Sequence, residues 1–130
     1  MSATRILGVR FDLIDYEAAL ARIDVWRTTG RREYVTITNP HSVCLCRRDR
    51  DMGAATAGAG LTLPDGVGVL LGARLLGYEH KGRVTGPTLM LKVCDWGRRH
   101  GYRHFFYGGQ EGVADALVER LCGLFPGLVV

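Results

Sequence analysis

The chain has 130 residues, of which 47% are hydrophobic and 23% charged, a composition typical of one soluble globular domain. These values exclude a disordered, collagen-like or coiled-coil protein, and no apolar run reaches the roughly 18 residues of a membrane-spanning helix. The formal net charge of +4 favours phosphorylated ligands or an anionic membrane face, without by itself indicating nucleic-acid binding.

The first half of the chain is expected to alternate extended segments with helices. Apolar spacing and capping residues predict, in chain order, an extended segment at 5–13, a helix from Asp15 to about Gly30, a strand at 33–38, a helix from Asn39 to about Arg48, a short helix at 51–59, a strand at 61–63 and a helix from Val67 to Gly77.

The second half continues the same alternation. It is expected to hold a helix opened by Thr85–Pro87 and stopped by Gly101, an aromatic strand at 102–107, a turn at Gly108–Gly109, a helix ended by Gly123 and Pro126, and the start of a strand at 127–130. Strands that alternate with helices predict an α/β fold with a Rossmann-like parallel sheet and flanking helices. We expect residues 1–130 to form one such domain.

Ligands of parallel sheets bind beyond the carboxyl ends of the strands, and this rule selects three places in the chain. Thr38 and Asn39 lie at the end of the strand at 33–38. Asp65 and Gly66 follow the strand at 61–63, and Gly108 and Gly109 follow the strand at 102–107.

Asp65 is the candidate general base, because a carboxylate at a strand end, flanked by glycines, can lie close to a ligand. The same run, Pro64 to Gly68, is also what an ordinary turn contains. The local pattern therefore leaves both roles open.

Two further segments could bind phosphates. Gly108 and Gly109 precede a helix N-terminus, where free N–H groups suit a diphosphate, although Glu111 adds negative charge and a tight turn would explain both glycines. Arg83 precedes the Thr85-Gly86 helix start and could hold a phosphate through two hydrogen bonds, but a lone loop arginine is commonly a solvated surface residue.

Metal, hydrolase and disulfide chemistry find no support in the sequence. The four histidines lack metal-ligand spacing, and no serine-hydrolase or zinc-protease motif is present. The four cysteines form no metal knuckle and, with no secretory signal at the N-terminus, are expected to be reduced thiols. We expect no metal, no cofactor and a cytoplasmic location.

Three motifs together resemble those of the WecG/TagA/CpsF family of bacterial glycosyltransferases (glycosyltransferase family 26). They are AGLTLPDGVGVLLGARLLG at 59–77, RVTGP at 83–87 and YRHFFYGG at 102–109. Their order and spacing match the family over residues 5–130.

The resemblance implies inverting transfer of an N-acetylhexosamine-type sugar, N-acetylmannosamine or its uronic acid, from a UDP donor. The implied acceptor is a polyprenyl-diphosphate-linked sugar on the way to a cell-surface polysaccharide. By position, Asp65 corresponds to the family's general base. The implied substrate-binding residues are Thr38, Asn39, Gly66, Arg83, Thr85, Gly86, Gly108 and Gly109.

The chain departs from the family in two respects. Ile37 stands where many relatives have threonine, and members run to about twice this length, so we expect a chain truncated at its C-terminus. The alternative function is an inactive or partner-dependent nucleotide-sugar-binding chain, and nucleic-acid binding is not expected. Contact with the inner face of the plasma membrane and assembly into a homo-oligomer are left open.

Overall fold

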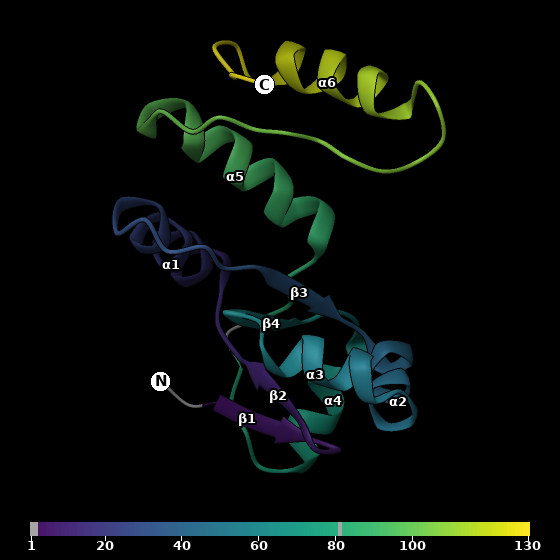
Figure 1. The fold of residues 1–130 in the computed structure, drawn as a ribbon. Coiled ribbons are helices and arrows are strands. Elements are labelled where there is room, and N and C mark those ends of the chain that lie inside the picture. The colour runs from purple at the N-terminus through teal and green to yellow at the C-terminus, as the bar shows by residue number, and fades with distance from the viewer. Residues whose placement is uncertain (1–2, 81) are drawn as a thin grey trace. The chain divides into compact units, whose positions relative to one another are not determined.

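The computed structural model describes residues 3–80 and 82–130, which divide into two compact units (Figure 1). The first unit ends at Gly86 and the second is Pro87–Val130. Each unit is described by itself. The expectation of one domain stays a prediction.

The first unit contains two small sheets and four helices within its described residues. Its elements are β1 (Ala3–Ile6), β2 (Val9–Asp12), α1 (Tyr16–Thr28), β3 (Val35–Thr38), α2 (Pro40–Arg48), α3 (Arg50–Ala57), β4 (Leu61–Pro64) and α4 (Val67–Leu75). The next helix, α5 (Gly86–His100), begins on the last residue of this unit.

The N-terminal segment is a β-hairpin rather than one extended stretch. β1 and β2 pair antiparallel, with Ile6 opposite Val9, so that only Leu7 and Gly8 make the turn. Both turn residues have positive φ angles, 49° and 85°, as the commonest two-residue hairpin turns require. The prediction for 5–13 missed this turn because Leu7 is a rare residue at positive φ.

The predicted helix caps of the first unit are confirmed. The Asp15 side chain accepts a hydrogen bond from the Ala18 N–H at 2.9 Å, and α1 begins at the next residue. Asn39 caps α2 in the same way, with Pro40 at the first helical position.

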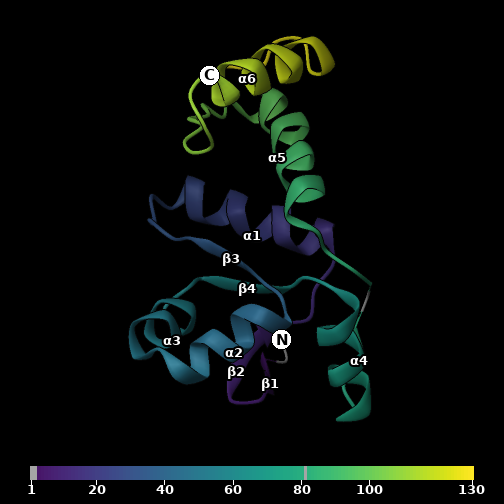
Figure 2. The same ribbon diagram turned by 90° about the vertical axis from the view of Figure 1, so that its right-hand side faces the viewer.

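The two predicted βαβ strands pair in parallel. Val35 to Thr38 of β3 lie opposite Leu61 to Pro64 of β4, and every residue of β4 is buried. Figure 2 shows α1 on one side of this pair and α2 and α3 on the other. The mixed α/β fold with a parallel sheet flanked by helices is therefore confirmed, and the sheets are as small as an incomplete Rossmann-like fold would give.

A hydrophobic cluster joins the hairpin to the helices. Its buried members are Ile6, Val9, Phe11, Val43, Val69 and Ala73. The cluster fixes the hairpin against α2 and α4, and it thereby holds the N-terminal ends of both helices in place.

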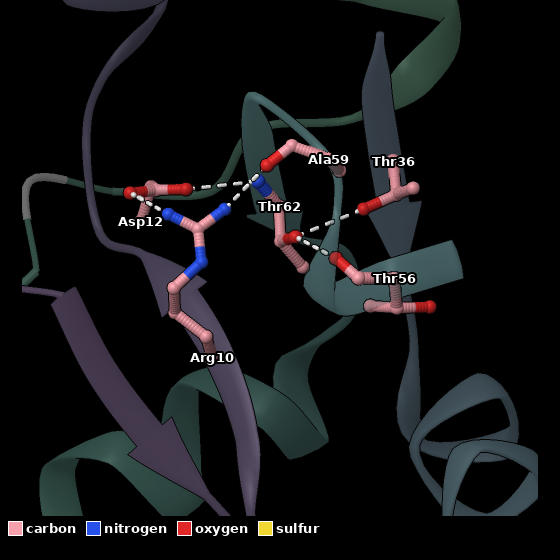
Figure 3. A network of polar contacts seen from close by, with 6 residues as sticks. All are labelled: Arg10, Asp12, Thr36, Thr56, Ala59 and Thr62. Atoms are coloured by element: carbon pink, nitrogen blue, oxygen red, sulfur yellow. Dashed lines mark hydrogen bonds and ion pairs between the residues drawn. The ribbon is translucent and has the colours of Figure 1, made fainter. Parts of the chain in front are cut away.

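A polar network joins the hairpin to β4 (Figure 3). The Thr62 N–H donates to Oδ2 of Asp12 at 2.9 Å, and Arg10 donates to the Ala59 carbonyl at 2.7 Å. From the neighbouring strand β3, Oγ1 of Thr36 donates to Oγ1 of Thr62, which in turn donates to the Thr56 carbonyl. β4 is thus held from both neighbouring elements by groups that have hydrogen-bond partners.

The second unit contains α5 and α6 (Val113–Leu124), joined by a segment that is not the predicted strand. Within 102–107 the described pairing is one parallel bridge from Arg103 to Val129, with the His104 N–H donating to the Val129 carbonyl. The predictions of a strand at 102–107 and of one at 127–130 are therefore wrong beyond this bridge.

The physical reason lies at the end of α5. The Tyr102 N–H donates to the Gly97 carbonyl at 3.0 Å, across Gly101 at φ 68°, so the first residue of the predicted strand closes the helix. The Tyr102 ring then lies on Gly97, where a Cβ would be 2.7 Å from Cβ of Tyr102. A strand also needs a partner along its whole length, and here only Val129 pairs with the segment, opposite Arg103.

Candidate active site

The carboxyl ends of β3 and β4 lie side by side. Thr38 is paired with Pro64, and the Asp65 N–H donates to the Thr38 carbonyl at 2.9 Å. Asn39 and Asp65 therefore both follow directly on paired residues. The structure brings together four of the sequence-predicted residues, namely Thr38, Asn39, Asp65 and Gly66.

Two helices begin at this strand end. Asn39 caps α2, and Gly66, at φ 95°, is the residue before α4 and provides no side-chain cap. A Cβ at Gly66 would lie 3.7 Å from Cδ of Pro40, and one at Gly68 would lie 2.9 Å from Cγ of Pro40. Both helix N-termini thus meet beside Asp65, and their free N–H groups and dipoles favour an anionic ligand there.

The Asn39 side chain has a defined orientation. Its Oδ1 accepts hydrogen bonds from the Ser42 N–H at 2.9 Å and from Oγ of Ser42 at 3.1 Å. Because the carbonyl oxygen is used in the cap, the amide nitrogen is the group left to donate to a ligand. Asn39 can therefore cap the helix and contribute a donor to the strand-end site at once.

The segment before α5 lies alongside β3. Thr85 N–H donates to Oη of Tyr16 at 2.9 Å, and the two hydroxyl oxygens are 3.4 Å apart. Next to it, a Cβ at Gly86 would lie 3.5 Å from Cγ1 of Ile37. The Thr85-Gly86 turn therefore borders the last residues of β3, as the site prediction requires.

Tyr16 is the site-bordering residue that the sequence did not single out. It is the first residue of α1, directly after the Asp15 cap, and its hydroxyl reaches the Thr85 backbone 69 residues further along the chain. An aromatic residue at a helix start carries no local signal of such a contact, which only the tertiary fold creates.

Arg83 is exposed and lines a pocket on α4. The pocket has a volume of about 320 Å³ and is lined by Val67, Leu70, Leu71, Arg74, His80 and Arg83. Val67 begins α4 two residues after Asp65, so the pocket adjoins the strand-end site. Lys81, two residues before Arg83, lies outside the described residues.

Gly108 and Gly109 belong to the second unit. Their φ angles, 120° and 78°, confirm the predicted turn, and a Cβ at Gly109 would lie 3.1 Å from Cγ1 of Val113 in α6. Asp65 belongs to the first unit. Their role at the same site stays a prediction.

Side chains with displaced pKa values lie in the second unit. Hydrogen bonding to Arg98 lowers the pKa of Asp95, whereas burial raises the pKa of the Cys94 thiol and lowers that of His104. Burial favours the neutral form of both side chains, because it disfavours the charged thiolate of Cys94 and the charged imidazolium of His104.

The part of the chain that the structure describes holds neither a metal-binding cluster nor a helix able to cross a membrane. There, no three His, Cys, Asp or Glu side chains gather closely enough to hold a metal ion. None of the described helices combines the length and apolar character needed to cross a membrane. The expectation that the chain needs no metal stays a prediction.

A parallel sheet with a carboxylate and two helix N-termini at its strand ends is an arrangement that α/β proteins use to bind anionic ligands. Residues 4–130 match the Glycosyl transferase WecG/TagA/CpsF family, and the chain belongs to this family. The resemblance seen in the sequence is confirmed.

Two relatives are both named N-acetylglucosaminyldiphosphoundecaprenol N-acetyl-beta-D-mannosaminyltransferase. The protein of Bacillus spizizenii is 28% identical over 97 residues, and that of Bacillus subtilis is 23% identical over 96. The aligned stretch covers 75% and 74% of this chain but 38% of each relative.

Proposed function

We propose that the chain carries the acceptor-activating part of an inverting glycosyltransferase. It transfers an N-acetylhexosamine-type sugar, N-acetylmannosamine or its uronic acid, from a UDP donor to a polyprenyl-diphosphate-linked sugar during cell-surface polysaccharide synthesis. The observation that carries this proposal is the position of Asp65 at the joined ends of β3 and β4, in a chain of this family. The names of the two relatives support the sugar and the acceptor.

In the proposed reaction, a hydroxyl oxygen of the acceptor sugar attacks C1 of the donor sugar from the face opposite the UDP. The new C–O bond forms as the bond from C1 to the diphosphate oxygen breaks, and UDP leaves with that electron pair. The Asp65 carboxylate accepts the hydroxyl proton. Attack from the opposite face inverts the configuration at C1.

The residues around Asp65 supply binding and charge stabilisation. Asn39 donates through its amide nitrogen, and the free N–H groups that follow Gly66 face the developing negative charge. The Thr85-Gly86 turn, held by Tyr16, forms the wall on the β3 side. Arg83, Gly108 and Gly109 are assigned to phosphate groups of the substrates.

Such a chain acts on the cytoplasmic side, at the inner face of the plasma membrane where the lipid-linked acceptor is available. The proposal includes two further partners, the membrane surface and a second copy of the chain, and both need a test.

The test replaces Asp65 with asparagine, which removes the base while keeping the side-chain volume. Transfer of labelled sugar from UDP-N-acetylmannosamine to polyprenyl-diphosphate-linked N-acetylglucosamine should fall by about 10²–10⁴-fold. UDP binding should stay nearly unchanged. Asp51→Asn, on the exposed first turn of α3, is the matched control and should keep full activity. An Asp65→Asn rate within a few-fold of the parent chain would leave Asp65 as a turn residue only.

A second candidate function is nucleotide-sugar binding without transfer. It is favoured by the position of Asp65 in the turn between β4 and α4, where its N–H donates to the Thr38 carbonyl as in an ordinary turn residue. UDP-sugar binding by the parent chain with no transfer at any acceptor concentration would establish this second function in place of the first.

A further inference from the structure

We propose that the exposed face of α4, with His80 and Arg83, binds the diphosphate and the first isoprene units of the lipid-linked acceptor. This inference rests on the proposed function and adds the place where the acceptor lies. It assigns binding roles to Arg74, His80 and the α4 leucines, which the sequence did not single out as site residues.

The first observation is the composition of the α4 pocket, defined above by its six lining residues. Three of them are apolar, and the other three, Arg74, His80 and Arg83, carry cationic or hydrogen-bonding nitrogen groups. No Asp or Glu of the described residues lines the pocket, and the neighbouring Glu79 is outside it. A small pocket with basic groups over an apolar floor fits a ligand that is anionic at one end and apolar at the other.

The second observation is that the basic groups are available. Within the described part of the chain, neither Arg74 nor Arg83 forms an ion pair. Nδ1 of His80 is buried and has no hydrogen-bond partner there. A buried polar atom without a partner is costly unless a ligand supplies one, and two guanidinium groups match the oxygens of a diphosphate.

The third observation is an apolar stripe along the same helix. Val67, Leu71 and Leu75 lie at helical spacing i, i+4 and i+8, with Arg74 beside them, and the Leu75 side chain is 80% exposed. A second pocket of about 370 Å³ runs along the neighbouring face of α4, between this helix and α2, and meets the stripe at Leu75. Figure 2 shows α4 at the margin of the first unit.

The order of these groups along α4 matches the order of groups in the acceptor. From Gly66 to Arg74 the helix rises about 12 Å, which separates the strand-end carboxylate from Arg74, while the pocket extends back to Val67 at the start of the helix. The acceptor sugar would lie at Asp65, its diphosphate at Arg74, His80 and Arg83, and its isoprene chain on Leu75 and the apolar pocket.

The apolar stripe favours the acceptor over the UDP donor. A uracil and a ribose need several hydrogen-bond partners, whereas the side chains of the stripe, Val67, Leu71 and Leu75, offer none. An isoprene chain needs only apolar contact.

The test measures binding of the chain to phosphatidylcholine vesicles that contain polyprenyl diphosphate. Reference vesicles contain enough phosphatidylglycerol to match the charge. The parent chain should bind the polyprenyl diphosphate vesicles more tightly than the reference vesicles. Arg74→Gln should weaken this binding by about tenfold or more, and Leu75→Gln by a few-fold. Arg47→Gln on α2 and Val25→Gln on α1 are the matched exposed controls and should bind as the parent chain does.

Several results would overturn the inference. They are equal binding to both kinds of vesicle, equal loss in the control variants, and a parallel loss of UDP binding in Arg74→Gln, which would make this the donor site. A change from dimer to monomer in Leu75→Gln, with unchanged vesicle binding, would show instead that α4 pairs two copies. Vesicle binding requires no catalysis, so the two proposals can fail separately. If the chain binds the vesicles as expected but transfers no sugar, the proposed function is wrong and the α4 binding site stands.

Discussion

The two units of the chain use their strand-forming sequences differently. In the first unit, four short strands all find partners, and β4 is buried along its whole length. In the second unit, the segment 102–107 also contains aromatic residues that favour extended structure, but it forms only one bridge within the described residues. Phe105 and Tyr107 of this segment are 88% and 96% exposed.

The difference shows that a strand is defined by its neighbours as much as by its own residues. β-propensity measures how well a side chain fits a pleated, half-buried surface, and this surface exists only where another strand and a covering helix are present. β4 has both, since β3 pairs with it and Thr56 of α3 bonds to Thr62. Segment 102–107 has one paired residue.

The largest effect that tests this comparison is expected from Phe11→Ala. Phe11 is fully buried in the hydrophobic cluster, so its truncation should lower the free energy of unfolding of the first unit by about 3–5 kcal/mol. Denaturant unfolding followed by hydrogen exchange would assign the loss to residues before Gly86. Phe105→Ala is the matched control in the second unit and should change stability by less than about 0.5 kcal/mol. Equal losses in both variants would show that 102–107 is packed like the first unit.

A smaller effect is expected at the contact between α5 and Tyr102. Gly97→Ala places a Cβ 2.7 Å from Cβ of Tyr102, and the necessary shift should cost about 1–3 kcal/mol of unfolding free energy. Gly123→Ala in α6 meets nothing within 4 Å and should instead stabilise the helix by up to about 1 kcal/mol. Amide exchange in α5 and α6 would separate the two. A neutral Gly97→Ala would mean that Tyr102 does not rest on α5.

The smallest effect concerns pH and His104. Burial lowers the pKa of His104 below its ordinary value of 6.5, so the unfolded chain binds this proton more readily than the folded chain. Stability from this group is therefore complete above about pH 6.5 and declines as the pH falls toward the folded-state pKa. Amide protection factors of the second unit, which are corrected for the intrinsic exchange rate at each pH, should fall in that range, and His104→Gln should remove this dependence on pH. An unchanged profile in His104→Gln would assign the acid sensitivity to another group.

The sequence predicted those elements whose signals are local. Asp15 and Asn39 cap helices where expected, because a short polar side chain at a helix start satisfies the nearest free N–H groups. The hairpin turn at Leu7 was missed since leucine rarely adopts positive φ, and the strand at 102–107 was overpredicted since pairing is not a local property.

The candidate site was predictable to the extent that it follows from topology. The strand-end rule requires only that 33–38 and 61–63 be neighbouring parallel strands, and it correctly brought Asn39 and Asp65 together. The contact of Tyr16 with Thr85 and the pocket shared by Arg83 and Arg74 depend on how α1 and α4 pack. No spacing in the sequence encodes these contacts.

The bond between Asp12 and Thr62 also determines how the parallel sheet can widen. The outward N–H of Thr62 is an edge donor that would otherwise template another strand, and here a carboxylate occupies it. Arg10 occupies the nearby Ala59 carbonyl in the same way. Within the described residues β3 pairs with β4 alone, so its outer edge is the open one. These two side chains thus protect the β4 edge against further strand pairing, and the β3 edge keeps its backbone groups for a partner.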